Sequence, residues 1–91
     1  MIHEVMLIMK PTLTDDEQHA VIEKHFEGLN ITKIENWGVK ALAYEMDGFN
    51  RGAYYLVSIT GTPSDALVTL DRNIKLDVKN ILRHLIIRKG E

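Results

Sequence analysis

The stretch RGAYYLVSI, residues 51–59, comes close to a pattern used by RNA-recognition strands. That pattern has a basic residue, then Gly, then aromatic residues spaced two apart, because bases stack on rings that share one face of a sheet. Here the two positions that should carry the stacking rings are Ala53 and Tyr55. Whether this stretch can stack bases depends on which face of its strand Tyr54 and Tyr55 occupy.

The residue types that support catalysis are present, but their spacing is unsuitable. His19 and His25 are six residues apart, so they fall on different faces of a helix, and neither His3 nor His84 has ligand spacing to a carboxylate. The acidic run at residues 15–17 is explained by a helix N-terminus, which stabilises ionised carboxylates. No phosphate loop or nucleophile motif is present. We therefore expect no enzyme activity, no metal site and no cofactor.

The charge of the chain is unevenly distributed. The net charge is -2, which by itself argues against nucleic-acid binding. Residues 1–50 hold four Lys/Arg and nine Asp/Glu, giving -5, whereas residues 51–91 hold seven and four, giving +3. The basic residues of this second part form either a phosphate-facing patch or an ordinary solvated edge. They include Arg72, Lys75, Lys79, Arg83, Arg88 and Lys89.

Length and composition limit the class of protein. With 91 residues, of which 45% are hydrophobic, we expect a single domain over residues 1–91. The absence of cysteine excludes disulfides and thiolate metal sites and is compatible with a reducing cytosol. The longest apolar run is too short to span a bilayer, and the N-terminus lacks the features of a signal peptide. We therefore expect a cytoplasmic protein with no membrane partner.

Hydrophobic periodicity predicts six elements along the chain. Thr14 and Glu17 form a capping-box pattern before the first helix, and Thr62 is the expected N-cap of the second. In the long second strand we expect Trp37 to share a face with Val39 and to act as a packing anchor. The elements are a strand at 3–9, a helix ending near 28–30, a strand at 31–46, a turn at 47–50, a strand from 51, a helix from 62–65 and a strand at 81–88.

This order predicts the ferredoxin-like sandwich, an α+β fold with βαββαβ order, a four-stranded antiparallel sheet and two helices on one face. Two right-handed crossovers place the first and third strands side by side in the centre, and we expect that central pair to be parallel. The second and fourth strands then form the edges. Because both helices cover one face, the other face stays open for binding.

The phase of the third strand answers the question about RGAYYLVSI. Ala53 and Tyr55 belong to its uniformly apolar face, which should lie under the helices. The motif is therefore out of phase with base stacking. The open face instead receives Tyr54, Leu56, Met6 and Ile8, an apolar patch that favours docking of a protein partner or, alternatively, self-association.

The stretches HEVMLIMKP and KIENWGVKALAY, together with the closing NILRHLIIRKGE, resemble the sixth protein of the bacterial small ribosomal subunit. The second stretch is the most specific, because family members carry an acidic residue, Trp-Gly, basic residues and Leu-Ala-Tyr. The chain departs from the family at Val39, where relatives often carry a basic residue, and at Glu45, where they often carry Pro. The resemblance covers essentially the whole chain.

The resemblance implies a structural component of the small ribosomal subunit that binds the central domain of 16S rRNA together with the eighteenth small-subunit protein. We expect RNA phosphates to meet Lys40, Arg51, Lys79, Arg83 and Arg88, and the partner to meet Met6, Ile8, Tyr54 and Leu56. A different class of function remains open, namely a small dimeric regulatory or ligand-binding domain of the same fold.

Overall fold

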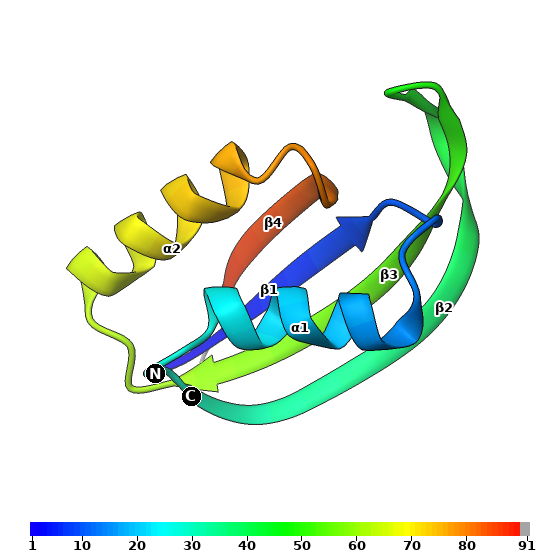
Figure 1. Cartoon of the computed structure of the whole chain (residues 1–91). Coiled ribbons are helices and arrows are strands. Elements are labelled where there is room, and N and C mark those ends of the chain that lie inside the picture. The colour runs from blue at the N-terminus through cyan, green and yellow to red at the C-terminus, as the bar shows by residue number, and fades with distance from the viewer. Residues whose placement is uncertain (90–91) are drawn as a thin grey trace.

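The computed structural model describes residues 1–89. Its two helices lie side by side on one face of a four-stranded sheet, as Figure 1 shows, and we call the opposite face the open face. The predicted ferredoxin-like sandwich is confirmed. The elements are β1 (Ile2–Met9), α1 (Asp15–His25), β2 (Asn30–Met46), β3 (Phe49–Thr60), α2 (Ser64–Leu76) and β4 (Ile81–Lys89).

The sheet has the strand order β2-β3-β1-β4, with β1 and β3 in the centre as predicted. The expectation that this central pair is parallel is wrong, because β1 and β3 pair antiparallel, with Val5 opposite Val57. In each strand–helix–strand crossover, the second strand runs parallel to the first, but one other strand of the sheet lies between them. The strand that fills the gap runs the opposite way, so every neighbouring pair in the sheet is antiparallel.

Helix α1 begins as its sequence predicts. The hydroxyl of Thr14 accepts a hydrogen bond from the backbone N–H of Glu17, and the Glu17 carboxylate accepts one from the N–H of Thr14 at 2.8 Å. This capping box satisfies two N–H groups that the helix cannot pair internally. Val21, Ile22 and Phe26 then bury the predicted stripe against the sheet.

Helix α2 begins one residue later than its sequence suggests. Thr62 is not the N-cap, because that position is taken by Pro63, which has no side chain able to accept a hydrogen bond. The hydroxyl of Thr62 is buried without a partner, and the Asp65 carboxylate accepts from the neighbouring N–H of Ala66. Neither helix of residues 1–89 is long and apolar enough to cross a membrane.

Strands β2 and β3 form a long hairpin that extends beyond the rest of the sheet (Figure 1). Its turn needs only Asp47 and Gly48, which have φ values of 49° and 82°. Positive φ at both central residues is the geometry of a type I′ turn, whose twist matches that of the strands. Residues 42–45 of β2 bulge out of the ladder, between Ala41 opposite Arg51 and Met46 opposite Phe49.

The core lies between the helices and the covered face of the sheet. Tyr55 is fully buried there, as the phase of β3 predicts, and its hydroxyl donates a 2.5 Å hydrogen bond to the side-chain oxygen of Gln18 on α1. Burial and the nearby charge of Asp15 raise the pKa of this phenol. The largest side chains of the core that are fully buried are Tyr55, Leu7, Met9, Ile59, Ile74, Val5 and Val57.

Candidate nucleic-acid interface

Two of the five predicted phosphate contacts lie on the open face. Residues that pair directly across a sheet point to the same side of it. Lys40 pairs with Gly52 and Arg83 pairs with Ile8, and both partners belong to the open-face rows of their strands. The two cations therefore stand on one surface, although they come from β2 and β4 at opposite edges of the sheet.

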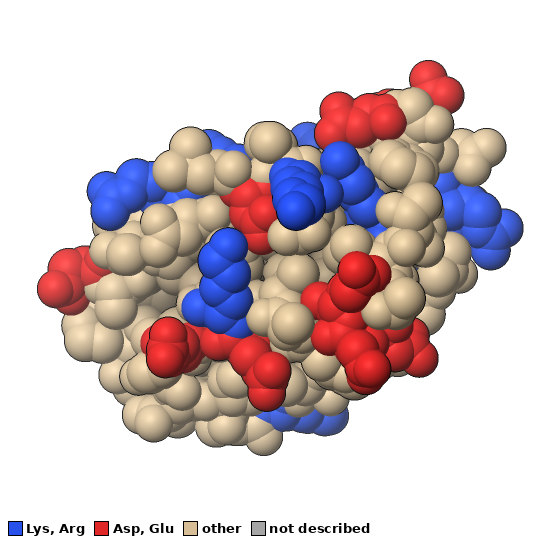
Figure 2. Space-filling model, in the orientation of Figure 1, with Lys and Arg blue, Asp and Glu red and all other residues tan. Residues whose placement is uncertain are grey.

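The other three predicted contacts lie elsewhere. Arg51 pairs with Ala41 and Arg88 pairs with His3, and these pairs belong to the rows that face the helices. Lys79 lies in the connection between α2 and β4. Figure 2, which views the molecule from the helix side, shows acidic side chains gathered near the start of α1 and basic ones in separate places. The five residues therefore do not form one continuous patch.

Lys40 lies above the ring of Trp37, with its ammonium 5.3 Å from the ring centroid. The expectation that Trp37 packs beside Val39 is wrong, because a β-bulge shifts the phase of β2 between Asn36 and Gly38. The backbone N–H of Gly38, whose φ is +81°, donates to the side-chain oxygen of Asn36 at 2.9 Å. The bulge turns Trp37 to the side of Lys40, where 38% of its surface is exposed.

The indole of Trp37 is fixed by a second contact. Its N–H donates to the carboxylate of Glu35 at 3.1 Å, and this hydrogen bond, helped by Lys33, holds the pKa of Glu35 below its ordinary value. The ammonium of Lys33 is 3.5 Å from the same carboxylate. Trp37 is therefore an ordered surface ring rather than a core anchor.

Arg83 forms a second cation–aromatic pair at the other edge of the sheet. Its guanidinium lies 5.6 Å from the ring centroid of Tyr44 and donates a hydrogen bond to the Tyr44 hydroxyl. Tyr44 belongs to the bulged segment 42–45, so the bulge brings a ring of β2 to a side chain of β4 across the two central strands. Tyr44 is 56% exposed.

Between β1 and β4 the open face has a shallow hollow of about 360 Å³. We call it the β1–β4 hollow, and its lining residues are Met6, Ile8, Arg83, His84 and Leu85. Of the predicted partner contacts, Ile8 and Leu56 are only 8% exposed, whereas Met6 and Tyr54 are half-buried.

Two exposed apolar side chains of the open face, those of Leu85 and Ile87, were not among the predicted partner contacts. Leu85, 54% exposed, and Ile87 pair with Met6 and Glu4 of β1, so they share the open face with those residues. The alternating positions of Arg83, Leu85 and Ile87 in the sequence already indicate that these side chains share one face of the strand. The strict alternation that separates Tyr54 from Tyr55 on β3 also separates Leu85 and Ile87 from Ile86 on β4.

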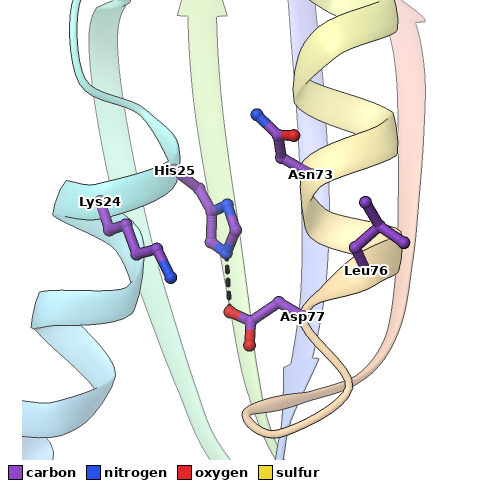
Figure 3. Close-up of a pocket in the computed structure, with 5 residues that line it drawn as sticks. All are labelled: Lys24, His25, Asn73, Leu76 and Asp77. Atoms are coloured by element: carbon purple, nitrogen blue, oxygen red, sulfur yellow. Dashed lines mark hydrogen bonds and ion pairs between the residues drawn. The ribbon is translucent and has the colours of Figure 1, made fainter.

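Three of the four histidines contact a neighbouring side chain, whereas the buried His3 has a ring nitrogen, Nδ1, without a hydrogen-bond partner among residues 1–89. His25, at the end of α1, and Asp77, just after α2, form a 2.7 Å contact whose two side chains are almost fully buried (Figure 3). Burial alone would raise the pKa of Asp77, but hydrogen bonds from His25 and Asn80 outweigh it and the pKa is lowered. A hollow of about 300 Å³ adjoins this pair.

His84 makes the same kind of contact, at 2.7 Å, with Asp71 of α2. The hydrogen bond from His84 lowers the pKa of Asp71 despite a small opposing effect of burial. His19 packs edge-on against the Tyr55 ring, with 6.3 Å between centroids. Within residues 1–89, no three side chains of the metal-ligating types come together.

Comparison with known proteins identifies the family. Residues 3–88 match the family model described as ribosomal protein S6. The chain is 37% identical to the small ribosomal subunit protein bS6 of Desulforamulus reducens, over 98% of this chain and 97% of that protein. It is 34% identical to the protein of the same name from Moorella thermoacetica, over 98% and 94% of the two chains.

A solved structure supports the same assignment. The crystal structure of 30S ribosomal protein S6 from Thermotoga maritima superposes with a TM-score of 0.74 at 27% identity, over 97% of this chain and 86% of that one. Sequence and fold thus agree over nearly the full length of the described chain. The chain belongs to the ribosomal protein S6 family.

Proposed function

We propose that this protein binds the central domain of 16S rRNA together with the eighteenth small-subunit protein, as a structural component of the small ribosomal subunit. Membership of the S6 family carries the proposal, since the family match spans residues 3–88. A protein of this family belongs to the ribosome and therefore works in the cytoplasm.

Lys40 and Arg83 are the first candidates for phosphate contact. Each is exposed on the open face, where neither faces a carboxylate partner among residues 1–89. Arg51, Lys79 and Arg88 lie on other surfaces, so they would meet different segments of a folded RNA. Contacts of this kind fix the position of the RNA without reading its sequence.

The partner is proposed to dock on the β3 side of the open face. Tyr54 and Met6 offer the accessible apolar surface there, and the nearly buried Ile8 and Leu56 lie beside them as their cross-strand neighbours. A net charge of -2 makes the chain a weak RNA ligand by itself. A basic partner would offset that charge, so RNA affinity should rise when the two proteins bind together.

Co-purification tests the proposal directly. The tagged protein, recovered from bacterial extract at low salt, should carry small-subunit particles with it. Persistent absence from those particles would contradict the proposed function. Light scattering of the purified protein covers the alternative, because a tight homodimer that ignores both RNA and the partner would indicate a regulatory domain of the same fold.

Charge-removal variants test the residues. Lys40→Gln and Arg83→Gln should each weaken binding of the protein pair to central-domain RNA. Each should also make the salt dependence, d log K/d log[salt], less steep by the amount that corresponds to about one phosphate contact. Lys24→Gln, on α1, is the matched control that removes a cation outside the proposed contacts. Equal effects of all three variants would show that only total charge matters.

A further inference from the structure

We propose that the β1–β4 hollow binds one unpaired RNA base, held between the apolar floor of the hollow and the Arg83–Tyr44 pair at its rim. This inference rests on the proposed RNA-binding function and adds a base contact to the phosphate contacts described above. Four observations on the open face support it.

Two carboxylates of the open face form ion pairs with nearby lysines, whereas Lys40 and Arg83 on the same face do not, within the part of the chain that the structure describes. Glu35 has the ammonium of Lys33 at 3.5 Å, and Glu4 has that of Lys89 at 3.7 Å. Each of these two carboxylates therefore has an ammonium group beside it. Lys40 and Arg83 also lie on the open face, and neither has a carboxylate partner among residues 1–89.

Each of these two cations lies over an aromatic ring. Lys40 is above Trp37 and Arg83 is above Tyr44, at centroid distances of 5.3 and 5.6 Å. Proteins that bind single-stranded RNA combine cations, which follow the backbone, with rings or guanidinium planes on which bases stack. The phosphates of a nucleotide are attracted by these two cations.

The hollow adjoins only one of the two pairs. It is lined by Arg83 together with the apolar side chains of Met6, Ile8 and Leu85, and its volume of about 360 Å³ lies at the small end of ligand pockets. A flat base offers two apolar faces and a polar edge, which suits an apolar floor with one planar cation at the rim. A packed helix would need a longer groove.

The bulge of β2 fixes the rim in place. Leu42 lies against the neighbouring strand β3, with its Cδ2 3.2 Å from the position that a Cβ on Gly52 would occupy. That anchor holds the following Tyr44 against Arg83 on β4. The stacking ring therefore comes from a hairpin that is already ordered in the absence of RNA, so little conformational entropy is lost on binding.

An abasic oligonucleotide tests the base contact separately from phosphate contacts. The wild-type protein is titrated with a single-stranded RNA hexamer and with an abasic hexamer that has the same number of phosphates. We expect the intact hexamer to bind about 5- to 150-fold more tightly, the range that one stacked base provides. Equal binding of the two hexamers, or no measurable binding of the intact one, would overturn the inference.

A substitution at the rim provides the second arm. Tyr44→Ala should weaken binding of the intact hexamer by a similar factor and leave binding of the abasic hexamer unchanged, because the lost contact is already missing there. Tyr44→Phe, which keeps the ring, should bind as the wild type does. Tyr44→Ala removes no charge, so the salt slope should not change. An equal loss for both hexamers would contradict a base contact.

Methyl NMR locates the base and separates the two proposals. The methyl resonances of Met6 and Leu85 should shift on adding the intact hexamer, whereas that of Val68, on the outer face of α2, should not. Shifts caused by the eighteenth protein but not by RNA would assign the hollow to the partner and overturn the inference. Recovery with small-subunit particles would still support the proposed function in that case, and failure of that recovery would leave the hexamer results unaffected.

Discussion

Replacing Gly52 with alanine tests how closely the hairpin is packed against the open face. A Cβ at this position would stand 2.5 Å from Cγ2 of Ile8 and 3.2 Å from Cδ2 of Leu42. The first distance is far below van der Waals contact, and Ile8 is stiff because it is β-branched. The substitution therefore forces β1, β2 or both to move.

The expected cost follows from two opposing effects. Adding a methyl group to a well-packed site costs about 1–3 kcal/mol. Alanine also lowers the conformational entropy of the unfolded chain, which stabilises by about 0.4–1 kcal/mol where the backbone is compatible. We therefore expect Gly52→Ala to lower the free energy of unfolding by roughly 1–2 kcal/mol. Urea denaturation followed by far-UV circular dichroism measures this as a lower transition midpoint.

A double-mutant cycle identifies the cause of the loss. Ile8→Ala removes Cγ2, so in that background Gly52→Ala should cost little or become stabilising. Because Ile8→Ala by itself costs about 2–5 kcal/mol, all four proteins are measured in sulfate buffer, which strengthens the folded state. The same loss in both backgrounds would refute the reasoning. Gly38→Ala is the matched control, since its Cβ meets nothing within 4 Å but its φ is +81°, and its loss should not depend on Ile8.

Three further changes have expected outcomes. Tyr55→Phe should lower the free energy of unfolding by about 1–3 kcal/mol in urea titration, because the buried side-chain oxygen of Gln18 loses its donor. Thr14→Ala should lower it by about 0.5–2 kcal/mol through loss of the N-cap of α1, and Thr14→Ser should restore most of it. The lowered pKa of Asp77 means that the unfolded chain binds the proton more readily, so this stabilisation is complete above about pH 4 and is lost as pH falls through the folded pKa. Thermal melts at pH 2–6 should show a weaker dependence on pH in Asp77→Asn, whereas an unchanged slope would show that the contact with His25 contributes nothing.

The elements of the fold followed from local rules in the sequence. The capping box at Thr14 and the Asp47-Gly48 turn depend on neighbouring residues alone, and both formed as these rules require. The phase of β3 placed Tyr55 in the core because an unbroken strand alternates strictly. Features that depend on a few adjacent residues, or on an unbroken period, can be predicted from one sequence.

The errors concern features with no local rule. The bulge at Trp37 inserts one residue into β2, so every position counted through it falls on the opposite face. Gly38 indicated that a bulge was possible, but not which residue would be displaced. Thr62 was a good cap by type, yet Pro63 occupied the capping position because the chain leaving β3 sets where the helix starts.

The distribution of the basic residues could not be predicted from their sequence positions. Arg83 and Arg88 lie five apart on one strand and therefore face opposite sides of the sheet. Lys40 and Arg83 are distant in sequence and share a face only because the strand order brings their rows together. The Tyr44–Arg83 contact required knowledge of a bulge four residues long, which no pattern in the sequence marks.

The central position of β1 has a consequence during synthesis of the protein. Its two edges pair with β3 and β4, and Ile2 stands opposite Lys89 near the end of the chain. β1 therefore leaves the ribosomal exit tunnel well before β4, the strand that completes its pairing. At about 5–20 residues per second, one backbone edge of β1 stays unpaired for several seconds before β4 has been made. The nascent chain must be kept from aggregating over that interval, since its sheet closes only after translation of its final strand.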